Sequence, residues 1–267
     1  MRLWKDRRRP MFEGSWGCSA RCVKAIVEAV VRREQGEAQA GQSDGRHNHR
    51  VPLGLVLLAQ GWITHPQLQH ALAVQKREGT GRIGRWLMAE CGLKEERVTR
   101  ALSVQWGCPV LPMDGFDPAA MALAAPKFLI ERLGIMPVRT AAGRILYLAF
   151  ADRPDASAAL AMGRMSGLTV ESGLVGEAEL KEARRRLFGC AFVEAVVEDV
   201  VDIDDLSSSI AATLSKLQPM ASRLVRVHEF YWLRLWLERG AMGAGDGGIP
   251  TTGEDVADRI YSIGTGH

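Results

Sequence analysis

The sequence predicts an α+β protein in which a small helical tandem-repeat unit precedes a compact α/β unit and a C-terminal extension of mixed structure. Three observations support this class. A 23-residue stretch whose apolar residues have helical spacing occurs twice. Short β-like runs then alternate with helical runs, and the last part of the chain contains runs of both types. We expect a leader and linker over residues 1–49, the repeats over 50–106, the α/β unit over 107–189 and the extension over 190–267.

The composition is that of a globular protein, with 47% hydrophobic and 24% charged residues among 267. No run approaches the roughly 18 apolar residues of a membrane span, and the start "MRLWKDRRRP" lacks the apolar segment of a signal peptide. Five cysteines without a framework spacing suit reduced thiols. We therefore expect a cytoplasmic protein that does not insert into membranes.

The leader is basic, and we expect it to be partly disordered. Residues 1–50 hold eleven Lys or Arg and six Asp or Glu. The run "CVKAIVEAVVRREQ" predicts one helix, and the polar, Gly-rich residues 36–49 predict a linker. Because aromatic residues are not interleaved with the basic ones, a solvated tail is favoured over contact with DNA.

The repeat unit consists of "LGLVLLAQGWITHPQLQHALAVQ", starting at Leu53, and "IGRWLMAECGLKEERVTRALSVQ", starting 30 residues later at Ile83. Apolar residues at three- and four-residue steps predict two short helices in each copy. In the first copy Gly61 marks the turn, and Thr64 with Gln67 forms a capping box that should start the second helix. The second copy lacks this capping box, so its turn is less well marked.

The α/β unit is predicted because short runs with the spacing of a strand alternate with runs that have the spacing of a helix. Ala142 and Gly143 separate two strand-like runs and predict a hairpin. The expected strands are "PVLPM", "IMPVRT", "RILYLAFA" and "LTVESGLV", and the expected helices are "APKFLIERLG", "DASAALAMGRMSG" and "GEAELKEARRRLFG".

The C-terminal extension is predicted by weaker signals. Spacing favours a helix over most of "AFVEAVVEDVVDIDDLSSSIAATLSKL". The run "LVRVHEFYWLRLWLE" fits strands or an amphipathic helix, and its β-branched and aromatic residues favour strands. A flexible loop, "GAMGAGDGGIPTTG", should precede a short final helix, "EDVADRIYSI".

The doubled pattern L-G-x-x-L-x-x-x-G-x-I-x-x-x-x-L-x-x-A-L-x-x-Q, followed by "GIMPVRTAAGRILYLAFADRPD", resembles the MshEN domain over roughly residues 50–189. This is the N-terminal domain of GspE-type ATPases of type II secretion and type IV pilus assembly. In that family the tandem motifs bind cyclic di-GMP, and each motif holds one half of the two-fold symmetric dinucleotide. The resemblance implies a non-enzymatic cyclic di-GMP receptor or signalling module, with secretion or pilus assembly proteins as further partners.

The resemblance also implies a role for each repeated residue type. Branched aliphatic side chains can pack on guanine faces, glycine allows close backbone approach, and Gln and Arg reach polar edges and phosphates. Leucine at helical spacing is also an ordinary core position, whereas packing alone does not require the repeated Gly and Gln. The candidate ligand-binding residues are Leu53, Gly54, Leu57, Leu68, Leu72, Gln75, Arg82, Ile83, Gly84, Leu87, Val98, Leu102 and Gln105.

Two positions depart from the doubled pattern. Pro52 occupies the place that Arg82 has in the second copy, and Cys91 occupies the place of Gly61. Arg50 lies two residues before Pro52 and is a candidate substitute for the missing cation. These departures favour an alternative function, a ligand-free adaptor that docks to the secretion or pilus machinery.

Motifs for catalysis and metal binding do not occur in the sequence. There is no G-x-x-x-x-G-K-[ST], no G-x-S-x-G and no H-E-x-x-H. His65 and His70 are five residues apart, which places them on different faces of a helix. We expect no catalytic residue, no metal and no cofactor, and we expect that the chain is not an enzyme.

Overall fold

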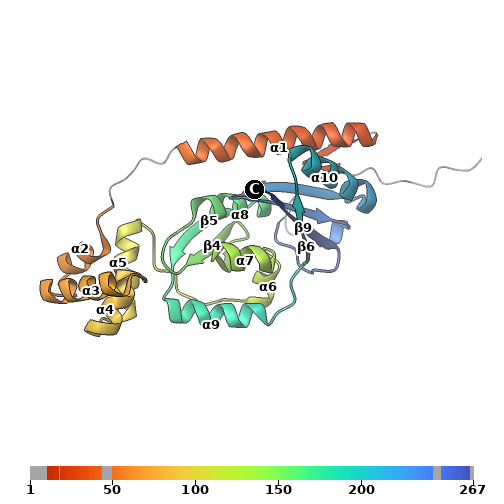
Figure 1. Cartoon of the computed structure of the whole chain (residues 1–267). Helices are drawn as coiled ribbons and strands as arrows, with labels where there is room; N and C mark the ends of the chain where they lie inside the picture. The colour runs from red at the N-terminus through yellow and green to blue at the C-terminus, as the bar shows by residue number, and fades with distance from the viewer. Residues whose placement is uncertain (1–10, 18, 44–49, 243–247, 265–267) are drawn as a thin grey trace, which may run out of the picture.

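The computed structural model describes residues 11–17, 19–43, 50–242 and 248–264. It confirms the α+β class, because the chain folds into helices and three small sheets (Figure 1). The repeat unit lies at one end of the molecule (Figure 1). Helix α1 lies beside the C-terminal sheet, on the side away from the α/β unit (Figure 1). Among the described helices, none is both long and apolar enough to span a membrane.

The repeat unit contains the four expected helices, α2 (Leu53–Ala59), α3 (His65–Glu78), α4 (Ile83–Cys91) and α5 (Glu95–Trp106). The predicted capping box is present, because the Thr64 side chain accepts from the Gln67 backbone and the Gln67 side chain accepts from Thr64 N. In the second copy Lys94 caps α5 without a side-chain hydrogen bond. Gly92, with φ of 65°, ends α4, so the positive φ that Gly61 supplies in the first copy moves one residue beyond Cys91.

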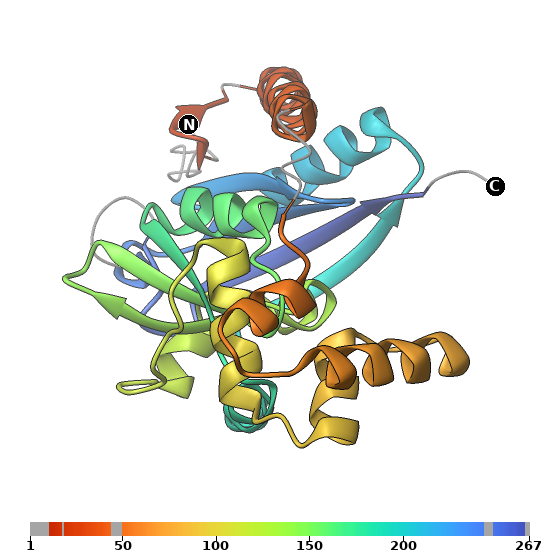
Figure 2. The same cartoon turned by 90° about the vertical axis from the view of Figure 1, so that its left-hand side faces the viewer.

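The helices of the two copies pack against each other. Helix α2 packs on α5, and α3 packs on α4, so the first helix of each copy contacts the second helix of the other. In Figure 2, which faces the repeat unit, α2 lies beside the yellow helix α5. Neither copy could bury its apolar stripe alone, which explains in physical terms why the motif occurs twice.

The α/β unit follows the prediction closely. Its sheet has the order β3-β4-β5, with β3 and β4 antiparallel and β4 and β5 parallel across the crossover helix α8. Ala142, Gly143 and Arg144 join β3 to β4. Ala142 and Gly143 have φ of 50° and 63°, the positive values that tight hairpin turns favour. Its elements are α6 (Pro118–Ala122), α7 (Lys127–Leu133), β3 (Met136–Ala141), β4 (Ile145–Phe150), α8 (Ala156–Ser166), β5 (Thr169–Leu174) and α9 (Glu177–Phe188).

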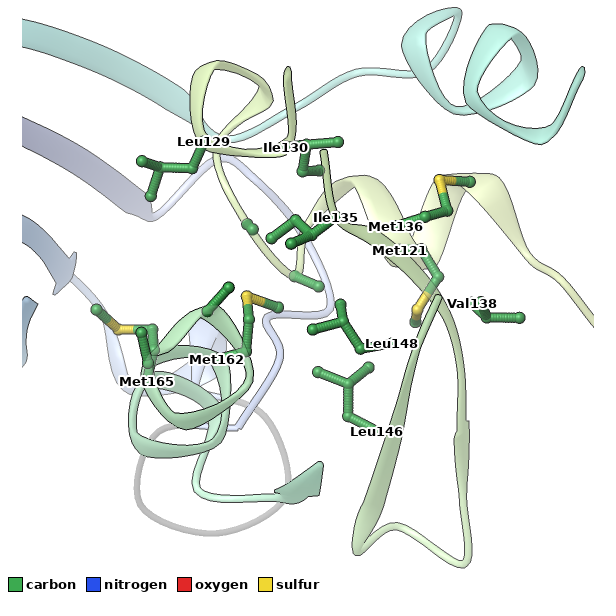
Figure 3. Close-up of a cluster of buried hydrophobic side chains, with 14 of the residues drawn as sticks. Met121, Leu129, Ile130, Ile135, Met136, Val138, Leu146, Leu148, Met162 and Met165 are labelled. Carbon is green, nitrogen blue, oxygen red and sulfur yellow. The ribbon is translucent and has the colours of Figure 1, made fainter. Parts of the chain in front are cut away.

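The core of this unit lies between its sheet and helices. Leu146 and Leu148 of β4 face Met162 of α8, and Ile135 lies close to them (Figure 3). The expected strand "PVLPM" forms only one isolated bridge, in which Val110 pairs in parallel with Leu174 of β5.

The C-terminal extension forms a second sheet with the order β6-β9-β8-β7. The two expected strands of "LVRVHEFYWLRLWLE" are confirmed as β7 and β8, which form an antiparallel hairpin. The elements are β6 (Glu194–Val200), α10 (Ile203–Leu217), β7 (Ala221–Val227), β8 (Phe230–Trp236), the 3-10 turn η1 (Arg239–Ala241) and β9 (Val256–Ile263).

Two predictions for the extension are wrong. Glu194–Val200 is a strand and not the first part of a helix, since its valines pair with β9 in parallel register. The run "EDVADRIYSI", expected as a final helix, contains the strand β9, which lies between β6 and β8. Both strands depend on partners distant in the sequence, and local spacing does not carry that information.

The described part of the leader packs against this second sheet, in contrast with the poorly ordered leader expected there. Helix α1 (Ala20–Ser43) lies on β7 and α10, with Val23, Val27 and Val31 buried among their apolar residues. The predicted linker is therefore helical up to Ser43, and its remainder, residues 44–49, lies outside the described residues. A short hairpin, β1 (Met11–Phe12) and β2 (Ser15–Trp16), precedes α1.

The second sheet is the middle layer of the molecule. One of its faces packs on α1 and α10, and the other packs on the α/β unit through residues such as Val225 and Trp232 (Figure 2). Arg234 and Asp258, each 1% exposed, form a buried ion pair at 2.7 Å within this layer. Arg234 Nη1 also donates to the carbonyl of Leu123 at 3.0 Å, which ties the extension to the α/β unit.

Candidate functional site

A cleft of about 560 Å³ lies where the repeat unit meets the α/β unit. Its walls come from α4 and α5, from the loop that follows β4, and from the start of α9. Helix α5 is the repeat helix nearest the α/β sheet (Figure 1). The lining residues are Leu53, Gly81, Arg82, Gly84, Arg85, Met88, Glu95, Val98, Thr99, Leu102, Gln105, Trp106, Ala151, Asp152, Arg153 and Glu177.

The cleft brings together part of the predicted site. The candidates that line it are Leu53, Arg82, Gly84, Val98, Leu102 and Gln105, nearly all from the second copy. The candidates outside it are Gly54, Leu57, Leu68, Leu72, Gln75, Ile83 and Leu87. Leu57 and Leu87 have no exposed surface and form the repeat core with Leu68, so their role is packing between helices.

The charges of the cleft are balanced. Arg82 caps the start of α4 and forms an ion pair with Asp152, which follows β4. Arg85 and Arg153 are the other cations of the lining, and Glu95 and Glu177 are the other acids. An anionic ligand at Arg82 would therefore have to replace Asp152.

Glu95 joins the two units at the edge of the cleft. Its Oε1 accepts a hydrogen bond from the backbone N–H of Ala178 at 2.9 Å, in the first turn of α9. A carboxylate near a helix N-terminus is stabilised by the unpaired N–H groups there. This role could not be predicted from the sequence, since Glu95 and Ala178 are 83 positions apart.

Trp106 ends α5 and contacts two arginines. The Arg50 guanidinium lies 3.7 Å from the centre of the Trp106 ring, and that of Arg153 lies 5.9 Å from it. Arg50, the suggested substitute for a cation at Pro52, thus stacks on Trp106 and does not line the cleft. Of these three residues, Trp106 and Arg153 line the cleft and Arg50 does not.

The repeated glutamines make equivalent contacts inside the repeat unit. Gln75 Nε2 donates to the carbonyl of Gly81, and Gln105 Nε2 donates to the carbonyl of Val51, both at 2.8 Å. Gly81 and Val51 are themselves 30 positions apart. Each glutamine therefore fixes the segment that precedes the first helix of the other copy.

The repeated glycines also have a packing role. A Cβ on Gly54 would lie 2.7 Å from Leu68, and a Cβ on Gly84 would lie 3.0 Å from Val98 and 3.4 Å from Leu53. Larger residues would separate the two helices of each copy. The repeated glycines thus allow close helix packing, and the repeated glutamines bind backbone carbonyls within the repeat unit.

Groups suited to metal binding do not gather in the part of the chain that the structure describes. No cluster of three or more His, Cys, Asp or Glu side chains lies there in a position to hold a metal. His70 contacts Glu90 at 3.5 Å. Burial raises the pKa of the Cys91 thiol and of the Cys108 thiol, which disfavours the reactive thiolate.

The sequence of the chain is similar to that of one curated protein in particular. It is 30% identical over 154 residues to the type IV pilus assembly ATPase PilB of Myxococcus xanthus (strain DK1622). That match covers 56% of this chain and 27% of PilB. The region with the doubled motif resembles the MshEN domain. No protein-family model matches the chain.

Solved structures similar to the chain include MshE with cdg, with 26% identity, a TM-score of 0.42, and coverage of 52% of this chain and 99% of that one. The N-terminal domain of XpsE has 19% identity and a TM-score of 0.34, and the similarity covers 50% of this chain and 92% of that one.

Proposed function

We propose that residues 50–189, which resemble the MshEN domain, form a non-enzymatic receptor that binds cyclic di-GMP in the cleft and passes its state to secretion or pilus assembly proteins. The observation that carries this proposal is the position of Arg82. It is the leading Arg of the second motif, it lines a cleft of about 560 Å³, and Arg85 and Arg153 line the same cleft. Planar guanidinium groups are the preferred partners of phosphates.

The apolar part of the cleft suits a guanine base. Leu53, Val98 and Leu102 offer aliphatic surface, and Trp106 offers an aromatic ring. Flat bases gain their binding energy from such surfaces, and cations at the rim hold the phosphates. In this arrangement the second copy makes the main contacts, and Leu53 is the contribution of the first.

Ligand binding in the cleft would change the contact between the repeat unit and the α/β unit. The Arg82–Asp152 pair joins the repeat unit to the α/β unit, and both side chains are largely exposed, 70% and 44%. Exposed ion pairs stabilise by at most about 1 kcal/mol, so a phosphate can displace Asp152 at low cost. The ligand would then change the contact between the two units, which a partner protein can detect.

Isothermal titration calorimetry of the full chain with cyclic di-GMP tests the proposal, with GTP as the control ligand. Arg82→Ala should weaken binding by about ten- to a hundredfold, since a charge-assisted hydrogen bond contributes about 1.5–3 kcal/mol. Arg100→Ala, at an exposed position of α5 outside the cleft, is the matched control and should bind normally. Equal loss in both variants, or loss of fold in Arg82→Ala, would contradict the proposal.

The second candidate function is the ligand-free adaptor. It is favoured by the three acids of the cleft, Glu95, Asp152 and Glu177, which oppose a dianionic ligand. It is also favoured by the packing roles of the repeated glycines and glutamines. Absence of heat with cyclic di-GMP at low ionic strength, from a protein that melts cooperatively, would support the adaptor.

A further inference from the structure

The sheet of the α/β unit has an edge that is only partly covered. Strand β5 is the outer strand of the order β3-β4-β5, and it lies next to helix α5 (Figure 1). The N–H of Val175 donates to the carbonyl of Phe150, so the odd-numbered residues of β5 bond toward β4. Because backbone groups alternate along a strand, the N–H and C=O groups of Val170, Ser172 and Leu174 point to the outer side.

The cover of this edge ends at Pro109. The N–H of Leu174 donates to the carbonyl of Pro109 at 2.9 Å, and the carbonyl of Leu174 accepts from the N–H of Leu111 at 2.8 Å. The next bond of this parallel ladder would join the N–H of residue 109 to the carbonyl of Ser172, but proline has no N–H. Among the described residues, neither the N–H of Val170 nor that of Ser172 has a backbone partner. The first part of the β5 edge is therefore open to another strand.

A groove of about 880 Å³ lies along this open part of the edge. Its lining comes from one face of α8, from β5 and from the end of α5. Leu160 of α8 is 59% exposed and offers apolar surface there. We call this feature the β5 groove and define it by Arg50, Trp106, Leu160, Arg164, Val170 and Ser172. Apart from Trp106, none of its lining residues lines the cleft of the repeat unit.

The side chains of the β5 groove favour an acidic occupant. Three arginines line it, Arg50, Arg164 and Arg223, and none of its lining residues in the described part of the chain is Asp or Glu. Arg50 is exposed, and its guanidinium stacks on Trp106 at 3.7 Å. Arg164 binds Glu34 of α1, and Arg223 donates to two carbonyls of α8, so the protein holds both in place. Carboxylates are the partners that fixed guanidinium groups select.

We propose that the β5 groove binds an extended acidic segment of a partner protein, which adds as a strand to the open edge of β5. The occupant is a strand because only an extended backbone offers both a donor and an acceptor at the spacing of Val170 and Ser172. In strand addition the main-chain hydrogen bonds provide affinity, and side chains on alternate positions provide specificity. The proposal does not rest on binding of cyclic di-GMP, because the groove and the cleft share only Trp106.

Fluorescence anisotropy of a labelled peptide with the full chain tests the proposal. The probe is a blocked peptide of about six residues, the length of an average strand, with alternating Glu and Val. A control peptide with Lys in place of Glu should bind more than about tenfold more weakly, because it meets arginines.

Two further forms of the probe test whether it binds as a strand. One carries N-methyl groups on its Glu residues, and the other carries them on its Val residues. A strand bonds to its neighbour through every second N–H, so only one of the two forms should lose binding. A shift by one residue would not rescue that form, because it turns the Glu side chains to the other face of the sheet.

Variants of the chain locate the binding site. Ser172→Pro removes an outward N–H and keeps the bonds to β4, and it should weaken binding of the probe by about tenfold or more. Arg50→Glu reverses an exposed charge of the groove and should do the same. Arg100→Glu is the matched control, since Arg100 is exposed on α5 outside the groove, and it should bind like the parent.

Circular dichroism melts show whether each variant is folded, and the two methylated probes on the parent chain replace Ser172→Pro if that variant unfolds. The proposal is supported if the acidic probe binds, one methylated form fails, and Arg50→Glu weakens binding while Arg100→Glu does not. Absence of binding at about 1 mM protein overturns it. Equal binding of the two methylated probes also overturns it, because the acidic ligand would then bind without strand pairing. Equal weakening by Arg50→Glu and Arg100→Glu overturns it as well, since the attraction would then be general.

Discussion

Asp152→Asn should tighten cyclic di-GMP binding, and this direction is opposite to that of Arg82→Ala. Asp152 both occupies the Arg82 guanidinium and repels an incoming phosphate. Two unit charges about 4 Å apart in water interact by about 1 kcal/mol. Because both side chains are largely exposed, we expect a total gain on the order of 1 kcal/mol, which corresponds to about fivefold tighter binding.

Calorimetry at about 50 mM and 150 mM salt measures this effect. The gain should shrink at the higher salt concentration, since the Debye length falls to about 8 Å. The melting temperature of the free protein should change little. Glu171→Gln, at an exposed position of β5 outside the cleft, is the control and should bind like the parent. If Asp152→Asn weakens binding, Asp152 positions Arg82 for the ligand, and the competition that we infer is incorrect.

Two further predictions concern stability. Asp258→Asn should lower the free energy of unfolding by about 3–5 kcal/mol in urea titrations, because it leaves the buried Arg234 cation without its anion. The control Glu182→Gln, in an exposed ion pair, should change the free energy of unfolding by less than about 1 kcal/mol. Equal effects of the two substitutions would contradict the role of burial. Burial raises the pKa of Tyr231 and of Tyr261, so the folded state keeps these protons longer than the unfolded chain does. The free energy of unfolding should therefore fall as the pH rises above about 10, and a flat profile up to pH 11.5 would contradict this.

The repeat unit shows which features could be predicted from sequence. Thr64 and Gln67 are three positions apart, and their reciprocal hydrogen bonds form within one helical turn. The turn at Ala142 and Gly143 is equally local. Such signals act over a few residues, so the sequence contains everything needed to interpret them.

The strands β6 and β9 show the opposite case. Glu194 pairs with Ala257, and the two strands between them in sequence, β7 and β8, lie on the other side of β9 in the sheet. Their valines and isoleucines fit a helix or a strand, and only the neighbouring strands decide between them. For the same reason helix α1 packs where a loose leader was expected, since its partners are more than 150 residues away.

The candidate site divides in the same way. The sequence by itself determined that a motif is doubled, that Arg82 has no counterpart at Pro52, and that the repeated positions lie on paired helices. Only the tertiary structure decided that one face of the pair forms a cleft, because Asp152 and Glu177 come from segments that follow a strand and start a helix far along the chain. It also decided that the glutamines and glycines hold the two copies together, since their partners are backbone atoms and side chains that meet only after the helices pack.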